Sequence, residues 1–237
     1  MKRLWKRFER LTNKCYLDLA EGGQAMNNWD DGYASLCAII EDGRSKDKDF
    51  ARELYLLDDG TDYQYDVQGW LEDYLDELSM HDRYAELERV CRQLLEMFQW
   101  EEVPSCDIRF MLSVALRSQG KLEEALDVCR QWHAEEPDDT SAAAALIYTQ
   151  TAMKDWEGAE ETVRKYISEG DPCTEDTELI FTAASALYRE NGDKKAGRRI
   201  DRAIRKYEDE MEEALLELDD EEELDFGVYS DDFLHRL

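Results

Sequence analysis

Histidine and cysteine, the side chains that most often carry chemistry, are few and widely separated in this chain. The three histidines are His81, His133 and His235. None has the spacing of a zinc protease motif or a nucleophile motif beside it. The six cysteines, which form no C-x-x-C pair, are Cys15, Cys37, Cys91, Cys106, Cys129 and Cys173. We expect reduced thiols in small core sites, because free cysteine behaves as a small buried hydrophobe.

The string YLLDDGTD, residues 55–62, comes nearest to an enzyme motif. It resembles the D-x-D-G-T motif of haloacid-dehalogenase-like phosphotransferases, which need a nucleophilic carboxylate two residues before the second aspartate. Leu57 occupies that position, so the nucleophile is absent. A calcium loop fails similarly, because Tyr55 and Leu57 would have to supply oxygen ligands. We expect a turn in which Gly60 ends a helix in the left-handed conformation.

Charge narrows the classes of partner. The formal net charge is −29, from 58 acidic and 29 basic side chains, and it would repel nucleic acids and anionic membranes. A hydrophobic content of 43%, with 6 Trp and 12 Tyr, favours a folded body over wholesale disorder. No glycine-rich phosphate cradle, secretory signal or membrane-spanning run is found. The sequence therefore predicts a cytoplasmic protein that is not an enzyme and has no cofactor or metal.

The first eleven residues, MKRLWKRFERL, have an amphipathic helical pattern. Leu4, Trp5, Phe8 and Leu11 share one side, and basic residues cover the rest. Such a helix can lie on a membrane or pack on the body of the protein. Packing is the favoured interpretation, because the acidic body would resist an anionic membrane.

Apolar spacing predicts helical hairpins in the middle of the chain. After Gly120 the apolar positions have the i, i+3, i+4, i+7 pattern of one helix face. They are Leu122, Ala125, Leu126, Cys129 and Trp132. The preceding segment has its own stripe at Ile108, Leu112 and Leu116. A short turn over residues 118–121 then joins two antiparallel helices.

A repeat connects this hairpin to the next. Ala125 and Ala159 are 34 residues apart (159 − 125), with similar apolar neighbours. A later helix carries Phe181, Ala184, Ser185, Tyr188 and Gly192, in the spacing of a W-x-x-L-G-x-x-Y signature and its turn glycine. Over roughly residues 67–207 the chain therefore resembles the tetratricopeptide repeat family, whose unit is a 34-residue helix pair.

The resemblance implies an all-α fold, a right-handed α-solenoid of about 10–12 helices in stacked antiparallel hairpins. Residues 1–66 would form N-terminal helices, interpreted as a degenerate repeat plus an extra helix over residues 46–59. Residues 67–207 would form the repeats. Residues 208–237 would form an acidic helix extension and a C-terminal tail.

In such a fold the first helices of the hairpins line a concave groove. The positions expected there are Phe110, Met111, Val114, Arg117, Ala144, Tyr148 and Thr151. Apart from Arg117, they lack the cationic and amide side chains with which some family members bind a peptide carboxylate. We therefore expect an apolar or basic-apolar protein segment as partner. Alternatively, Phe110 and Tyr148 pack against another helix of the same chain.

The C-terminal region combines acids with late aromatic residues. Positions 208–225 hold twelve acids and no base. The predicted docking tail that follows consists of Phe226, Tyr229, Phe233 and Leu234. It would dock in cis or in trans, or the region would be a disordered tail. The sequence thus predicts a protein-interaction scaffold that binds a peptide or helical segment. The alternative is a regulatory sensor or chaperone autoinhibited by its own tail.

Overall fold

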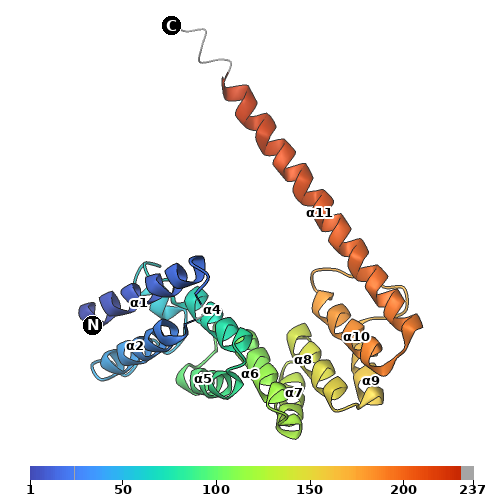
Figure 1. Ribbon diagram of the computed structural model, residues 1–237, viewed down its shortest axis with the longest axis horizontal. Coiled ribbons are helices and arrows are strands. Elements are labelled where there is room, and N and C mark those ends of the chain that lie inside the picture. The colour runs from blue at the N-terminus through green and yellow to red at the C-terminus, as the bar shows by residue number, and fades with distance from the viewer. Residues whose placement is uncertain (24, 231–237) are drawn as a thin grey trace. The chain divides into compact units, whose positions relative to one another are not determined.

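The computed structural model describes residues 1–23 and 25–230, and these residues form eleven helices and no strand (Figure 1). The expected all-α class is confirmed. The chain divides into two compact units, Met1–Ala125 and Leu126–Leu237. Their boundary falls inside helix α7 (Leu122–Glu135). The divisions expected at 66/67 and 207/208 follow the repeat pattern and stay predictions.

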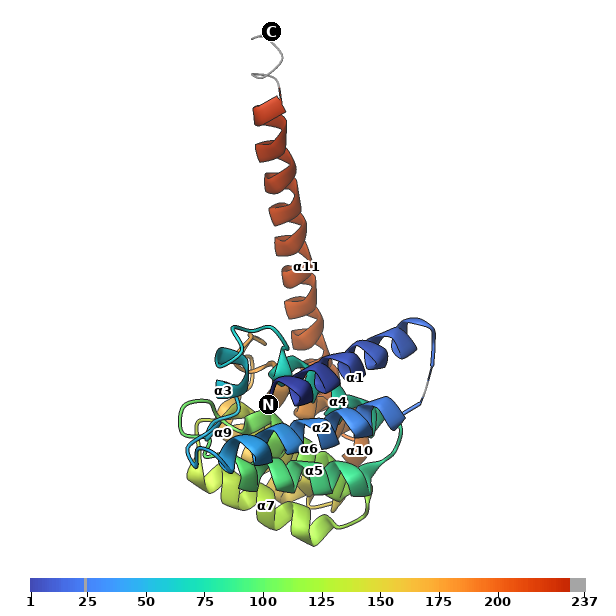
Figure 2. The same ribbon diagram turned by 90° about the vertical axis from the view of Figure 1, so that its left-hand side faces the viewer.

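The first unit is built from helical hairpins. Its helices before α7 are α1 (Lys2–Ala20), α2 (Asn27–Arg44), α3 (Leu56–Asp59), α4 (Val67–Met80), α5 (Tyr84–Met97) and α6 (Cys106–Ser118). Helix α1 packs on α2, and α5 packs on both α4 and α6. The short α3, labelled in Figure 2, contacts α4. Sequence neighbours are thus also packing neighbours, as the repeat pattern predicts.

The second unit continues the series. Beyond α7 it contains α8 (Thr140–Ala152), α9 (Trp156–Tyr166), α10 (Glu178–Asn191) and α11 (Lys194–Ser230). Helix α8 packs on α9 and α10, and α10 packs on α9 and α11. The two alanines that define the repeat spacing, Ala125 and Ala159, are both fully buried. A residue without a large side chain at these positions lets the paired helices approach closely.

Each hairpin turn of the repeat region contains one residue with left-handed backbone geometry. These residues are Asp82, Gly120, Lys154 and Gly192, with φ of 55°, 73°, 62° and 81°. At the first three turns, a backbone hydrogen bond of 2.8–3.0 Å closes the end of the helix. The N–H groups of Arg83, Lys121 and Asp155 donate to the carbonyls of Leu78, Leu116 and Gln150, respectively. This bond is the Schellman pattern that ends a helix sharply. Gly120 and Lys154 lie 34 residues apart (154 − 120), so the backbone has the same period as the sequence.

Two of these turns allow a matched test of backbone strain. A Cβ at Gly120 would meet no atom within 4 Å, so Gly120→Ala is expected to cost only the left-handed penalty, about 1–2 kcal/mol. Lys154→Gly removes the same strain and should stabilise the protein by up to about 1 kcal/mol. Urea unfolding of both variants measures this. If Lys154→Gly destabilises the protein as Gly120→Ala does, the backbone at Lys154 is not strained.

The apolar face of α1 packs against the body of the first unit. Phe8 is fully buried and meets Trp70 of α4 edge-on, with ring centroids 5.1 Å apart. Trp5 stacks on Tyr65 at 4.7 Å. Trp29 of α2 stacks on Trp70 at 5.8 Å, which extends the aromatic cluster into α2. This packing confirms the favoured interpretation of the N-terminal helix.

The extra helix expected over residues 46–59 is wrong for most of its length, because only Leu56–Asp59 is helical. Tertiary donors occupy the carbonyls that a helix would need. Arg44 donates to the carbonyls of Phe50 and Ala51 at 3.2 and 2.7 Å, and the Gln99 N–H donates to the carbonyl of Arg52 at 2.9 Å. Ala51 has a φ of 46°, which breaks helical geometry outright.

The DDGTD turn differs from expectation in a second way. Gly60 follows α3 at a φ of −66°, so the expected left-handed cap at this glycine is wrong. The turn instead positions Asp58, which is 1% exposed. Its carboxylate accepts from the N–H groups of Val67 and Gln68 at 2.6 and 3.1 Å, at the start of α4. Burial raises the pKa of Asp58, and these two donors oppose the rise. The motif is therefore a helix cap.

Candidate interaction surfaces

Helix α6 presents one buried and one partly exposed face. Ile108, Leu112 and Leu116 are buried. The predicted groove residues of this helix lie off that stripe and are half-buried; they are Phe110, Met111, Val114 and Arg117. The helical spacing thus places the packing stripe correctly. It leaves apolar side chains on a surface that retains contact with solvent.

Helix α8 differs from α6 because it is enclosed on nearly every side. Of its predicted groove residues, Tyr148 is half-buried, but Ala144 has no exposed surface and Thr151 is 8% exposed. The expectation that Ala144 and Thr151 face an open groove therefore needs correction. The α8 residues from Ala142 to Ile147 are all buried. The sequence TSAAAALIYTQTA has no single polar side, so its pattern does not indicate which side of the helix faces solvent.

The predicted docking tail lies only partly within the described residues. Phe226 and Tyr229 belong to the helix, which continues to Ser230. Phe233 and Leu234 lie outside the described residues. Docking of this tail stays a prediction.

The first half of α11 carries a dense group of positive charges on an otherwise acidic chain. We call it the α11 basic segment; it consists of Lys194, Lys195, Arg198, Arg199, Arg202, Arg205 and Lys206, all exposed. Asp201, the acid within it, accepts from the hydroxyl of Ser185 at 2.7 Å. Arg199 pairs with Glu169 at 3.3 Å and Lys206 with Glu210 at 3.2 Å. In the part of the chain that the structure describes, Arg198, Arg202 and Arg205 form no ion pair.

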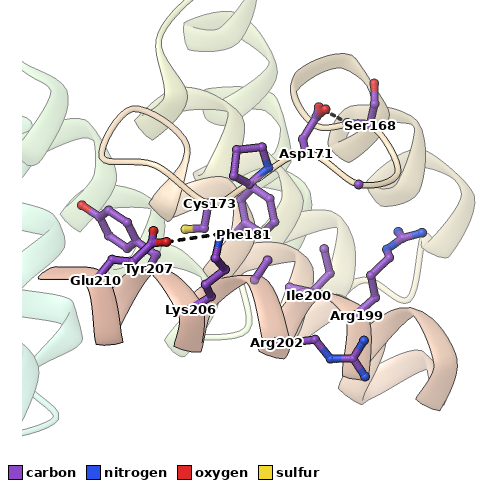
Figure 3. A pocket seen from close by; sticks show the side chains of 13 residues that line it. Ser168, Asp171, Cys173, Phe181, Arg199, Ile200, Arg202, Lys206, Tyr207 and Glu210 are labelled. Atoms are coloured by element: carbon purple, nitrogen blue, oxygen red, sulfur yellow. Dashed lines mark hydrogen bonds and ion pairs between the residues drawn. The ribbon is translucent and has the colours of Figure 1, made fainter. Parts of the chain in front are cut away.

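A pocket of about 250 Å³ lies between this segment, α10 and the loop before α10 (Figure 3). Buried apolar side chains, Cys173, Phe181 and Ile200, line it on the inside. Exposed cations line it on the α11 side, including Arg199 and Lys206. Burial raises the pKa of the Cys173 thiol, as do the nearby Glu178 and Glu208 carboxylates. The pocket therefore offers an apolar interior with a cationic edge and no reactive thiolate.

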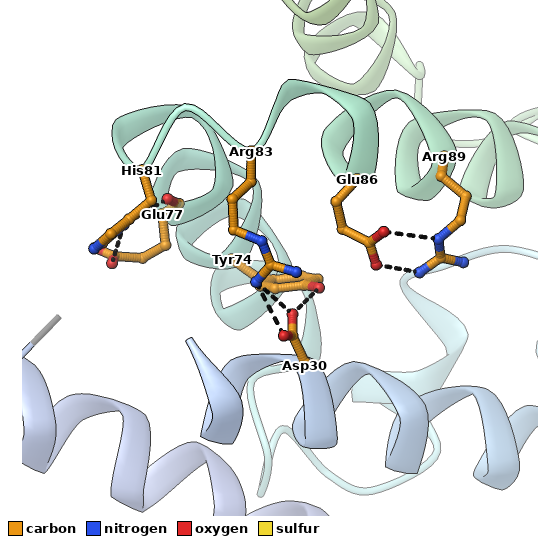
Figure 4. A network of polar contacts seen from close by, with 7 residues as sticks. All are labelled: Asp30, Tyr74, Glu77, His81, Arg83, Glu86 and Arg89. Atoms are coloured by element: carbon orange, nitrogen blue, oxygen red, sulfur yellow. Dashed lines mark hydrogen bonds and ion pairs between the residues drawn. The ribbon is translucent and has the colours of Figure 1, made fainter. Parts of the chain in front are cut away.

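The polar cluster of α2, α4 and α5 serves structure (Figure 4). Asp30 accepts from the Tyr74 hydroxyl at 3.0 Å and from Arg83 at 2.9 Å. Burial raises the pKa of Tyr74, and the Asp30 carboxylate raises it further. The Nδ1 atom of His81 lies 2.9 Å from the Glu77 carbonyl one helical turn back. These contacts tie α2 to the α4–α5 hairpin, which accounts for the cluster without acid–base chemistry.

The cysteine thiols also lack the features of reactive groups. All six cysteines are free, and four of them are buried. Burial raises the pKa of Cys15 to about 11 and that of Cys91 to about 12, so both thiols stay protonated near neutrality. Among the described residues, no group of His, Cys, Asp and Glu has the arrangement of a metal site. Within the same residues, no helix is long and apolar enough to span a membrane.

Comparison with known proteins points to the same kind of fold. Residues 116–176, which run from the end of α6 through α9, match the tetratricopeptide repeat family. These residues therefore form a tetratricopeptide-like helical repeat, and repeats of this kind generally mediate contacts between proteins rather than catalysis. No curated protein and no solved structure matches the chain significantly.

Sequence reasoning missed the α11 basic segment. Residues 194–206 fall inside the predicted repeats, residues 67–207, and their charges were left without a role. The signal was present in local composition. Seven basic residues within thirteen positions stand out in a chain of net charge −29.

Proposed function

We propose that the protein is a non-enzymatic scaffold that binds a peptide or helical segment of another protein through α6. The observation that carries the proposal is the face of α6, where Met111 and Val114 keep part of their apolar surface exposed beside a complete packing stripe. Phe110 and Arg117 on α6 would contribute to the same surface, and Tyr148 on α8 is a separate candidate contact. The net charge of −29 favours a basic-apolar segment over an acidic one.

The test is selection of peptides from a displayed random library, followed by titration of the selected synthetic peptides against the full chain. Met111→Ala combined with Val114→Ala is expected to weaken binding at least about tenfold. Tyr148→Ala tests α8 separately, because the two helices belong to different units. Glu123→Ala, on an exposed position of α7, is the matched control. If no peptide binds saturably, or the α6 variant binds like the control, the proposal fails.

Autoinhibition by the protein's own tail would require Phe226 and Tyr229 to reach a binding surface of the same molecule. Phe226 and Tyr229 lie on the same continuous helix as the α11 basic segment. They cannot fold back onto the adjacent pocket while α11 remains intact. Autoinhibition at that pocket would therefore require α11 to break.

A further inference from the structure

The α11 basic segment has an outer face turned away from the protein. Ile200, on the inner side of the helix, is 2% exposed and lines the pocket beside α10. Arg198, Arg202 and Arg205 follow one another at intervals of four and three residues, so they share one side of the helix. That side is opposite Ile200, because two residues turn an α-helix by about 200°. A shallow depression along it is lined by the three arginines together with Asp201, Lys206 and Asp209.

The same face changes sign farther along the helix. Continuing at helical spacing, it passes Leu216, whose side chain is 60% exposed, and then the positions of Asp220 and Glu223. One straight face therefore begins with three arginines and ends with acids. Isolated in water, each half has like charges at neighbouring positions, which is unfavourable.

This face cannot satisfy itself within one molecule. Its two halves belong to one continuous helix, Lys194–Ser230, so the acidic half cannot fold back onto the basic half. A second helix with the reverse order of charges would complement both halves at once. The same helix of another copy has that order when the two run antiparallel.

We propose that two copies of the protein associate through antiparallel pairing of their α11 helices. Arg202 of each copy lies opposite Asp220 of the other, and Arg198 lies opposite Glu223. The midpoint of each pair along the sequence lies within one residue of Met211. One two-fold axis passing near Met211 therefore relates both pairs. Arg205 then falls opposite Leu216, whose exposed side chain its aliphatic stem covers.

The same register also brings acids together near the two-fold axis. Asp209 of each copy faces Glu213 of the other, close to the axis. Both are exposed acids. Glu213→Lys converts this repulsion into attraction, and we expect it to tighten the dimer by about three- to tenfold. An unchanged or weaker dimer would overturn this register.

Charge exchange tests the pairing itself, with sedimentation velocity on the full chain as the measurement. The wild type should form a dimer that weakens as salt increases. Variant A carries Arg198→Glu, Arg202→Glu and Arg205→Glu. Variant B carries Asp220→Lys and Glu223→Lys. Each variant alone should dimerise at least about 100-fold more weakly.

Recovery in the mixture separates complementarity from general damage. Variants A and B mixed in equal amounts should form a heterodimer, because each basic half then meets an acidic half. The control, Lys2→Glu with Lys6→Glu and Arg10→Glu, reverses three exposed charges on α1 and should leave the dimer unchanged. A wild type that stays monomeric up to about 0.1 mM at low salt, or a mixture of A and B that stays monomeric, overturns the proposal. Neither result depends on peptide binding at α6.

Discussion

Trp70→Ala is expected to remove about 3–5 kcal/mol from the free energy of unfolding of the first unit. Trp70 is 1% exposed and contacts three aromatic rings from three helices. Those rings belong to Phe8 of α1, Trp29 of α2 and Tyr74 of α4 itself. An alanine leaves a cavity that none of these rings can fill without leaving its own partners. Urea unfolding followed by circular dichroism measures the loss.

A close approach of backbone to ring provides a second arm of this test. A Cβ on Gly32 would lie 2.6 Å from Cζ2 of Trp70, so Gly32→Ala alone should cost about 1–3 kcal/mol through overpacking. In the Trp70→Ala background the obstructing ring is gone. The same substitution should then cost little, and the double-mutant cycle should show strong coupling. Additive effects would contradict the packing of α2 on α4.

A tryptophan in the other unit supplies the control for Trp70. Trp156 on α9 is half-buried, so Trp156→Ala removes the same side chain from a less enclosed site. Its expected cost is about 1–2 kcal/mol. Hydrogen exchange should localise the damage of Trp70→Ala to α1, α2 and α4. Equal losses from the two tryptophan substitutions would refute the central role assigned to the aromatic cluster.

Asp58→Asn is expected to cost about 2–3 kcal/mol, the second largest effect. The native carboxylate accepts from two backbone N–H groups, those of Val67 and Gln68. An asparagine amide has one oxygen, so one buried donor would face an NH₂ group and lose its acceptor. The first turn of α4 should fray. Faster hydrogen exchange at residues 67–70, together with the unfolding free energy, measures the effect.

The neighbouring aspartate gives a matched control. Asp59 is exposed, and Asp59→Asn should change stability by less than about 0.5 kcal/mol. A large effect at Asp59, or none at Asp58, would show that the DDGTD turn does not cap α4. The pair also tests the functional interpretation, because Asp59 occupies the second aspartate position of the motif and Asp58 does not.

Periodicity was sufficient to predict most of the helices but not the segment between α2 and α4. Stripes such as Ile108, Leu112 and Leu116 determine which side of a helix is buried, and they depend only on local spacing. The failure at residues 46–59 arose from contacts distant in sequence. Gln99 donates to the carbonyl of Arg52 from after α5, and no local pattern reveals such a competitor for backbone hydrogen bonds.

The candidate site was predictable where helices are amphipathic. On α6 the polar and apolar sides differ, and Met111 and Val114 were correctly placed off the packing stripe. On α8 nearly every position is small or apolar, so spacing could not show that Ala144 and Thr151 are buried. The α11 basic segment required attention to charge, because its apolar stripe alone describes an ordinary packed helix.

The boundary inside α7 has a consequence for modularity. Glu124 in its first turn pairs with Arg92 of α5 at 2.5 Å, within the first unit. Cys129, one turn later, lies 3.5 Å from the Thr149 hydroxyl of α8, within the second. Dividing the chain at this boundary would leave severed helix ends, with up to four unpaired carbonyl groups on one fragment and four N–H groups on the other. The two compact units therefore cannot be exchanged or inherited separately as a shuffled gene segment without disrupting a helix that both require.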